Sequence, residues 1–185
     1  MDDAEYKEFV ESAYHGRVLI GVDRIFARRV YTDIPISTIR EATGEAPYLE
    51  KLVVWFAFLA SPLALLTSAV LAVLAFRWWA FLIVPVTFLW WMINRSMSVL
   101  GTSRIWFHTL VLIVAASVHF MNLLHNSWMS GFVMAFVFTM WSDRLLYCAS
   151  TFFLRAFVLR NKRALEAFGE GITIRERTRH NRHNN

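Results

Sequence analysis

The sequence contains a single cysteine, Cys148, among its 185 residues. One cysteine excludes an intrachain disulfide bond and a metal site built from several thiolates. It also gives no reason to expect an oxidising compartment.

Sequence signatures of well-marked enzyme classes are missing as well. The chain has no HExxH metalloprotease helix, no GxxxxGK[ST] phosphate-binding loop and no GxSxG nucleophile elbow. These absences remove the enzymes that a sequence identifies most easily, and they favour a non-enzymatic protein without excluding an enzyme. We predict no catalytic residue, no metal site and no cofactor.

The start of the chain, Met1-Asp2-Asp3-Ala4-Glu5, is acidic, and no short apolar core follows it. A cleaved signal peptide begins with basic residues and continues into such a core. We therefore expect no cleaved signal peptide here.

Apolar residues are abundant instead. They make up 57% of the chain, the mean hydropathy is +0.43, and there are sixteen phenylalanines and eight tryptophans. Soluble domains usually contain about 45–50% apolar residues. The composition therefore indicates an integral membrane protein.

Four apolar segments are candidates for crossing a membrane, for which about 20 residues suffice. We predict spans over residues 52–76, 78–93 and 105–124, and a fourth that begins between Trp128 and Phe132. The fourth continues past Asp143-Arg144 as one long helix that leaves the membrane near Arg155. The predicted fold is all-α, with four transmembrane helices.

The predicted organisation has three parts: a cytoplasmic N-terminal segment (1–51), a transmembrane domain (52–154) and a basic cytoplasmic C-terminal tail with a helical extension (155–185). The sequence leaves two points open: whether residues 145–159 lie inside the membrane, and where the first span ends.

The positive charges give an orientation. Seven lysines and arginines precede residue 52, nine follow from Arg144 onward, and the three predicted connections hold one, two and none. Four crossings with both ends inside place 18 of the 19 on the cytoplasmic side, as the positive-inside rule requires. We expect an inner or plasma membrane of bacterial type. Charges confined to the ends also argue against nucleic acid as a partner.

Residues 17–31 show helical periodicity, with Leu19, Val22, Phe26 and Val30 on one face and arginines opposite. The pattern predicts one amphipathic helix, either in the anionic headgroup layer or packed on the protein's own surface. The basic tail could attract anionic lipid headgroups in the same way.

Small residues form a stripe along the first predicted span. Such stripes let membrane helices approach closely, within one chain or between copies in a homo-oligomer. The stripe consists of Ala57, Ser61, Ala64, Ser68, Ala72 and Ala75.

Polar residues form a second stripe, on the third predicted span: Arg104, His108, His119 and Asn122. Polar groups facing lipid are costly, so this stripe should face the helix bundle, as structural hydrogen bonding or as a path for protons or ions. Haem is poorly supported, because the two histidines are about 16 Å apart along a helix and the other spans contain no histidine.

Asp143 and Arg144 lie deep within the fourth span, where ionisable residues usually pair or mark a functional site. The antiparallel third span brings Arg104 and His108 to the same depth. We predict a polar network that joins Asp143 to one of them.

The sequence favours a non-enzymatic subunit or scaffold of a membrane complex, with lipid and other membrane proteins as partners. The alternative is a small ion or solute transporter or channel that uses the polar stripe on the third span.

Overall fold

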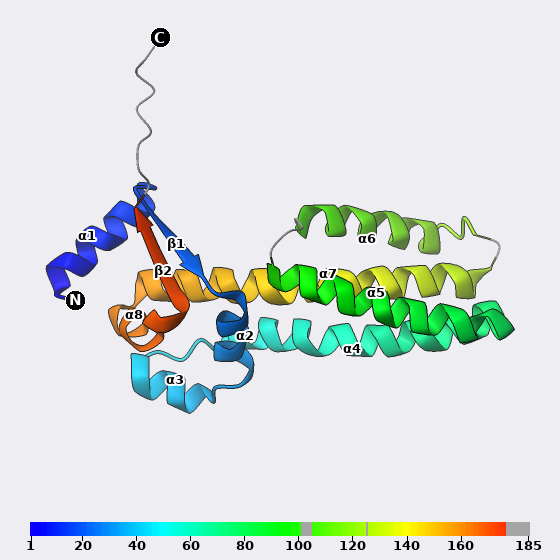
Figure 1. The fold of residues 1–185 in the computed structure, drawn as a ribbon, viewed down its shortest axis with the longest axis horizontal. Helices are drawn as coiled ribbons and strands as arrows, with labels where there is room; N and C mark the ends of the chain where they lie inside the picture. The colour runs from blue at the N-terminus through cyan, green and yellow to red at the C-terminus, as the bar shows by residue number, and fades with distance from the viewer. Residues whose placement is uncertain (101–104, 125, 177–185) are drawn as a thin grey trace, which may run out of the picture. The chain divides into compact units, whose positions relative to one another are not determined.

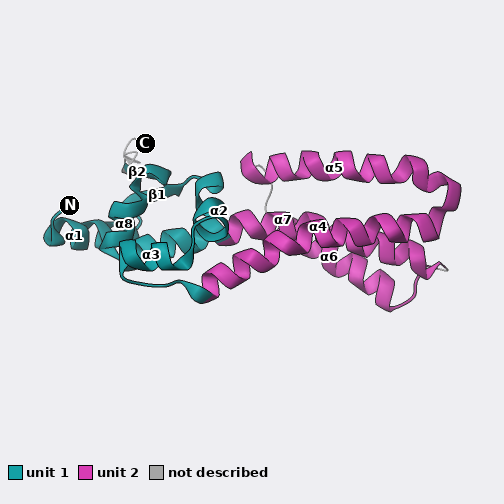
Figure 2. Cartoon of the chain, turned by 90° about the horizontal axis from the view of Figure 1, so that it is seen from below, with its two compact units in different colours: residues 1–48, 150–185 teal, residues 49–149 magenta. Residues whose placement is uncertain are grey.

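The computed structural model describes residues 1–100, 105–124 and 126–176. The chain divides into two compact units (Figure 2). Residues 1–48 and 150–185 form one, which we call the terminal unit, and residues 49–149 form the other, the helical unit. The two ends of the chain therefore belong to the same folded body, whereas the sequence analysis treated them as separate segments.

The terminal unit combines short helices with a two-stranded sheet (Figure 1). Its elements are α1 (Asp3–Tyr14), β1 (Val18–Val22), α2 (Arg24–Thr32), α3 (Ile36–Thr43), the end of α7 (Ser127–Arg160), α8 (Lys162–Phe168), η2 (Gly169–Gly171) and β2 (Ile172–Glu176). β1 and β2 pair antiparallel, with Ile20 opposite Ile174. The first strand of the chain thus pairs with its last described segment.

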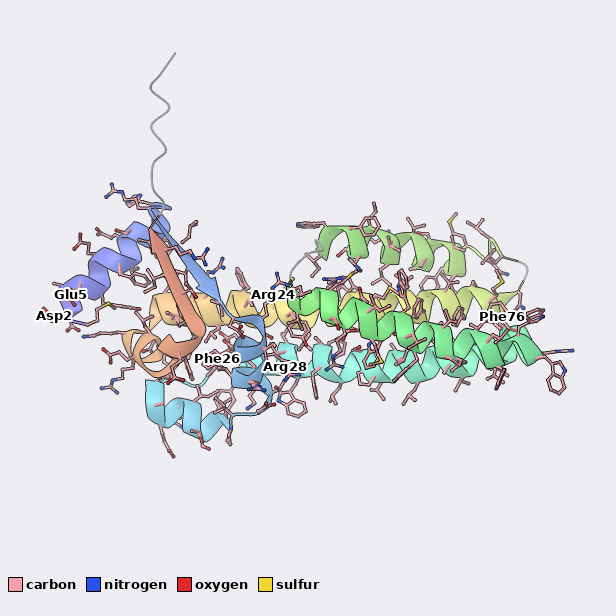
Figure 3. The ribbon with its side chains drawn as sticks, in the orientation of Figure 1. Asp2, Glu5, Arg24, Phe26, Arg28 and Phe76 are labelled. Atoms are coloured by element: carbon pink, nitrogen blue, oxygen red, sulfur yellow. The ribbon has the colours of Figure 1, made fainter. Side chains whose placement is uncertain are left out.

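Local signals define the helices of this unit. Asp2 and Glu5 form a capping box at the start of α1 (Figure 3), and the Asp23 carboxylate accepts a hydrogen bond from the Phe26 N–H at the start of α2. Gly44 ends α3 with φ +79°, a left-handed conformation that glycine adopts without strain.

Aromatic and aliphatic side chains fill the interior of the terminal unit. The Phe168 ring lies 6.4 Å from that of Phe26 and 6.5 Å from that of Phe157, and the Tyr31 ring lies 6.3 Å from that of Phe153. These contacts join α2 and α8 to the end of α7. Two long-range hydrogen bonds add to them: the Tyr6 hydroxyl donates to the Val158 carbonyl, and the Asn161 amide donates to the Thr43 carbonyl.

The prediction of one amphipathic helix over residues 17–31 is wrong in its first half. Residues 18–22 form β1, and the helix begins after Asp23. Valine and isoleucine favour strands, and pairing with β2 outweighs the helical periodicity. In α2, the buried residues Ala27, Val30 and Tyr31 face the interior of the unit. The apolar face of α2 therefore packs on the protein itself.

The helical unit contains α4 (Tyr48–Phe76), η1 (Arg77–Trp79), α5 (Ala80–Leu100), α6 (Ile105–Phe120) and the first part of α7. α4 and α5 form a hairpin that turns at η1 (Figure 1). The turn contains no glycine or proline, and Arg77 adopts a left-handed φ of 50°.

The predicted all-α class is confirmed in its coarse form, since the protein is mostly helical. Within the described residues, two segments are long and apolar enough to cross a membrane, Tyr48–Leu100 and Ser127–Arg160, and α6 is a shorter apolar helix of 16 residues. α7 continues through Asp143-Arg144 without a break. α5 ends seven residues later than the predicted span, and α6 ends four residues earlier.

Gly171 offers a test of the packing between α2 and η2. A Cβ atom at Gly171 would clash with the Phe26 ring, whereas a Cβ atom at Gly169 meets nothing within 4 Å. We expect Gly171→Ala to lower the free energy of unfolding by about 1–3 kcal/mol through overpacking. Gly169→Ala should be neutral or stabilise by up to about 1 kcal/mol. Thermal unfolding of the full chain in detergent measures both, and equal effects would refute this packing.

Candidate functional site

The most unusual residues of the helical unit are Asp143 and Arg144, in the middle of α7. Their side chains are 0% and 1% exposed. Removing charged groups from water costs several kcal/mol per ion unless partners compensate. The neighbours of this pair therefore decide what the site can do.

α5 supplies three of these neighbours. Trp91, Asn94 and Arg95 have the i, i+3, i+4 spacing that places residues on one helix face. Arg144 Nη2 donates a hydrogen bond of 3.2 Å to Asn94 Oδ1. The Arg95 guanidinium lies 5.3 Å from the centre of a Trp91 ring, within the range of a cation–π contact.

α4 supplies the remaining neighbour, Ser61, which is 1% exposed. Trp91 Nε1 donates a hydrogen bond of 3.1 Å to Ser61 Oγ. The Asp143 carboxylate interacts with the Ser61 hydroxyl, the Trp91 indole and the charges of Arg95 and Arg144. α4, α5 and α7 therefore meet at one polar cluster, which we call the Asp143 cluster: Ser61, Trp91, Asn94, Arg95, Asp143 and Arg144.

Hydrogen bonding in the Asp143 cluster is incomplete. Among the described residues, three buried atoms find no hydrogen-bond partner of standard geometry: both carboxylate oxygens of Asp143 and the amide nitrogen Nδ2 of Asn94. Buried acceptors and donors of this kind are rare in folded proteins. The cluster can thus join three helices electrostatically, and it retains a carboxylate able to accept one further donor.

The predicted network differs from this cluster in its partners. Arg104 lies outside the described residues. His119 Nδ1 lies 2.9 Å from Ser130 Oγ, which is about 20 Å along α7 from Asp143. Asn122 follows the end of α6, with φ 52°. His119 and Asn122 therefore do not join Asp143, because their positions along α6 place them near the start of α7.

The predicted depth of His108 agrees with the helix register. Trp141 Nε1 donates to Thr109 Oγ1 at 3.1 Å, so α6 runs antiparallel to α7. Together with the contact between His119 and Ser130, this bond places His108 level with Ser142. The described groups that act on Asp143 include Ser61, Trp91, Arg95 and Arg144, which come from α4, α5 and α7.

Sequence reasoning missed Trp91, Asn94 and Arg95 as members of the site. The predicted second span ended at residue 93, which placed Asn94 and Arg95 in a connection. Their i, i+3, i+4 spacing was the available signal. Ser61 had been assigned to the small-residue stripe instead.

The small-residue stripe lies on the inner side of α4. Ala57, Ser61, Ser68 and Ala72 are buried, and the other two members, Ala64 and Ala75, are half-buried. The stripe therefore contributes to packing within the chain, and Ser61 links it to the Asp143 cluster.

In the described part of the chain, no three histidine, cysteine, aspartate or glutamate side chains are placed to hold a metal ion. Comparison of the chain with protein-family models, with curated proteins and with solved structures finds no match.

A double-mutant cycle tests the partners of Asp143. Asp143→Asn should lower the free energy of unfolding by about 3 kcal/mol, because buried Arg144 and half-buried Arg95 lose their counter-charge. Arg95→Gln should cost less in the Asp143→Asn background than alone. Unfolding in detergent, with exposed Glu170→Gln as the control, measures each value.

His108, the partner predicted from the sequence, can be compared in the same cycle. Coupling of Asp143→Asn to His108→Gln should be weaker than coupling to Arg95→Gln, because Arg95 is the first of the described charges that act on Asp143. Coupling of Asp143 to His108, together with additivity for Arg95, would refute the Asp143 cluster and restore the network predicted from the sequence.

Proposed function

We propose that this chain is a non-enzymatic subunit or scaffold of a membrane complex, and that it crosses the bilayer four times. Two observations support the proposal: the placement of both chain ends in one unit, and an apolar groove on the helical unit. They bear on topology and on docking, respectively.

The number of crossings must be even if the helical unit lies in a membrane. β1 and β2 pair in one sheet, so both ends of the chain lie on the same side. The segment Tyr48–Leu100 reverses at η1 and counts as two crossings, and α7 counts as one. α6, which has 16 residues, is the fourth crossing that we propose, because it makes the number even.

The charge distribution supports a cytoplasmic location for the terminal unit. Of the 19 lysines and arginines, only Arg77 falls on the far side under this topology. Arg95 and Arg144 belong to the Asp143 cluster. Most of the other charges would face a cytoplasmic leaflet, as the positive-inside rule expects, and could contact anionic headgroups there. An inner or plasma membrane of bacterial type fits this arrangement.

Cysteine labelling tests the topology. In a Cys148→Ser background, Asn126→Cys should react with a membrane-impermeant maleimide on intact cells. Glu170→Cys, in the terminal unit, should react only after the cells are opened. Labelling of both positions on intact cells, or of neither, would refute four crossings with both ends inside.

The observation that carries the subunit proposal is an apolar groove of about 570 Å³ on the helical unit. α4, α6 and α7 line it, and small residues come from each of them: Ala60 and Ala64 from α4, Ala116 from α6 and Ala135 from α7. Along α4 the groove extends from Phe56 to Thr67, about 16 Å. It is therefore about three helical turns long.

A transmembrane helix of a partner subunit is the occupant we propose for this groove. Small side chains on all three walls would let a fourth backbone approach closely, and close packing is what drives association in lipid. α6 leaves room for such a helix, since Ala115 is its buried residue. An acyl chain gains little from small walls, because its own surface resembles the surrounding lipid.

Filling the groove tests the subunit proposal. Ala64→Phe and Ala116→Phe should each reduce, at least tenfold, the amount of protein that co-purifies stoichiometrically from native membranes in mild detergent. Leu66→Phe is the matched control, because Leu66 lies on α4 with 65% exposure and does not line the groove. Unfolding temperatures of all three variants separate lost docking from lost folding. Retention of the same partners by both groove variants would overturn the proposal.

Transport through the polar stripe of α6 is the alternative function. The stripe residues His119 and Asn122 lie apart from Asp143, so they do not form one continuous cluster with it. Ion flux by the purified chain alone in liposomes would favour this alternative over the scaffold.

A further inference from the structure

The terminal unit has a cavity of about 620 Å³ that follows β1. All five residues of β1, Val18–Val22, line it, together with Thr173 and Arg175 of β2. Neighbouring residues of a strand point to opposite faces of a sheet. Leu19 and Gly21 stand opposite Arg175 and Thr173, so the cavity lies over the sheet face that these four residues share, and it extends along the whole of β1.

The outer edge of β1, on the side away from β2, carries backbone groups that the β1–β2 ladder leaves unpaired. β1 pairs with β2 on one side, so every second residue directs its N–H and C=O groups away from β2. Within the described part of the chain, no backbone hydrogen bond outside the β1–β2 ladder involves Val18–Val22. An edge strand normally avoids further pairing through charged residues, proline or a covering element. β1 contains no charged residue and no proline.

Two arginines give the cavity a positive charge. Arg155 of α7 and Arg175 of β2 both line it and are exposed, and neither makes an ion pair with a described residue. The one carboxylate that lines the cavity, Asp23, accepts the hydrogen bond from the Phe26 N–H. Ala13, Leu19 and Leu159 add apolar wall.

From these observations we propose that β1 is a docking edge for an extended, acidic segment of a partner protein, which adds to the sheet as a third strand. Strand addition uses main-chain hydrogen bonds for affinity and alternate side chains for specificity. Here acidic side chains would meet Arg155 and Arg175, and apolar side chains would meet Leu19 and Leu159. The inference rests on the proposed role as a subunit, and it names the chemistry of one partner segment.

The charges also decide between occupants. A second copy paired through β1 would bring its own Arg155 and Arg175 to the same edge, and like charges repel. A lipid headgroup would satisfy the arginines but would leave the backbone of β1 unpaired. An acidic strand satisfies both.

Binding of synthetic peptides to the full chain in a non-ionic detergent tests the proposal. A short blocked peptide that alternates valine and glutamate should bind, and its affinity should fall with added salt. A peptide that alternates valine and lysine should bind at least tenfold more weakly. N-methylation of alternate residues of the acidic peptide removes ladder hydrogen bonds and keeps the charge. It should also weaken binding at least tenfold.

Variants of the protein locate the site. Arg155→Glu and Arg175→Glu should each weaken the acidic peptide at least tenfold, whereas Arg29→Glu, an equal charge change on the exposed side of α2, should not. Equal binding of the N-methylated peptide would overturn strand addition in favour of charge alone. Preference for anionic vesicles over the peptide, or a dimer that the peptide fails to disperse, would overturn it in favour of lipid or a second copy. The peptide test uses only the purified chain, so its outcome is independent of the groove experiment. Either experiment can fail while the other succeeds.

Discussion

The pairing of β1 with β2 is the constraint on which the rest of the structure depends. It joins Val18–Val22 to Ile172–Glu176 and so closes nearly the whole chain into one loop. Along the sequence, α4, α5 and α6 lie between the two parts of the terminal unit, and α7 runs from the helical unit into it. The sheet is small, yet it brings the two terminal parts of the chain together. Aromatic contacts of α2 and α8 with the end of α7 reinforce the closure.

Within the helical unit, packing and electrostatics act at the same place. Ser61 belongs to the small-residue stripe of α4 and also accepts a hydrogen bond from Trp91. Close approach of α4 to its neighbours is thus coupled to the position of the indole, of Arg95 above it and of Asp143. A buried ion cluster of this kind is weak evidence for stability. It is better suited to fixing one register among helices whose apolar surfaces could slide.

The sequence predicts long elements better than their partners. The long apolar helices could be predicted because hydrophobicity and length can be read from one segment of the sequence alone. β1 was mistaken for helix because Leu19, Val22 and Phe26 satisfy a helical period, and its partner strand lies more than 150 residues away. The depth of Asp143 was predictable from its position in the span. Its interaction with Arg95 depends on which helix packs beside α7, and no single segment contains that information.

The turn at η1 has a consequence for biogenesis. Three residues, Arg77–Trp79, separate α4 from α5. So short a connection leaves no length of chain for one helix to remain in water while the other sits in lipid. Under the proposed topology, α4 and α5 would therefore enter the bilayer together as a helical hairpin, carrying Arg77 across at its tip. β1 is synthesised before this step and β2 after the last apolar helix. The sheet can consequently close only after all the apolar helices have been synthesised, and a closed sheet would mark that stage.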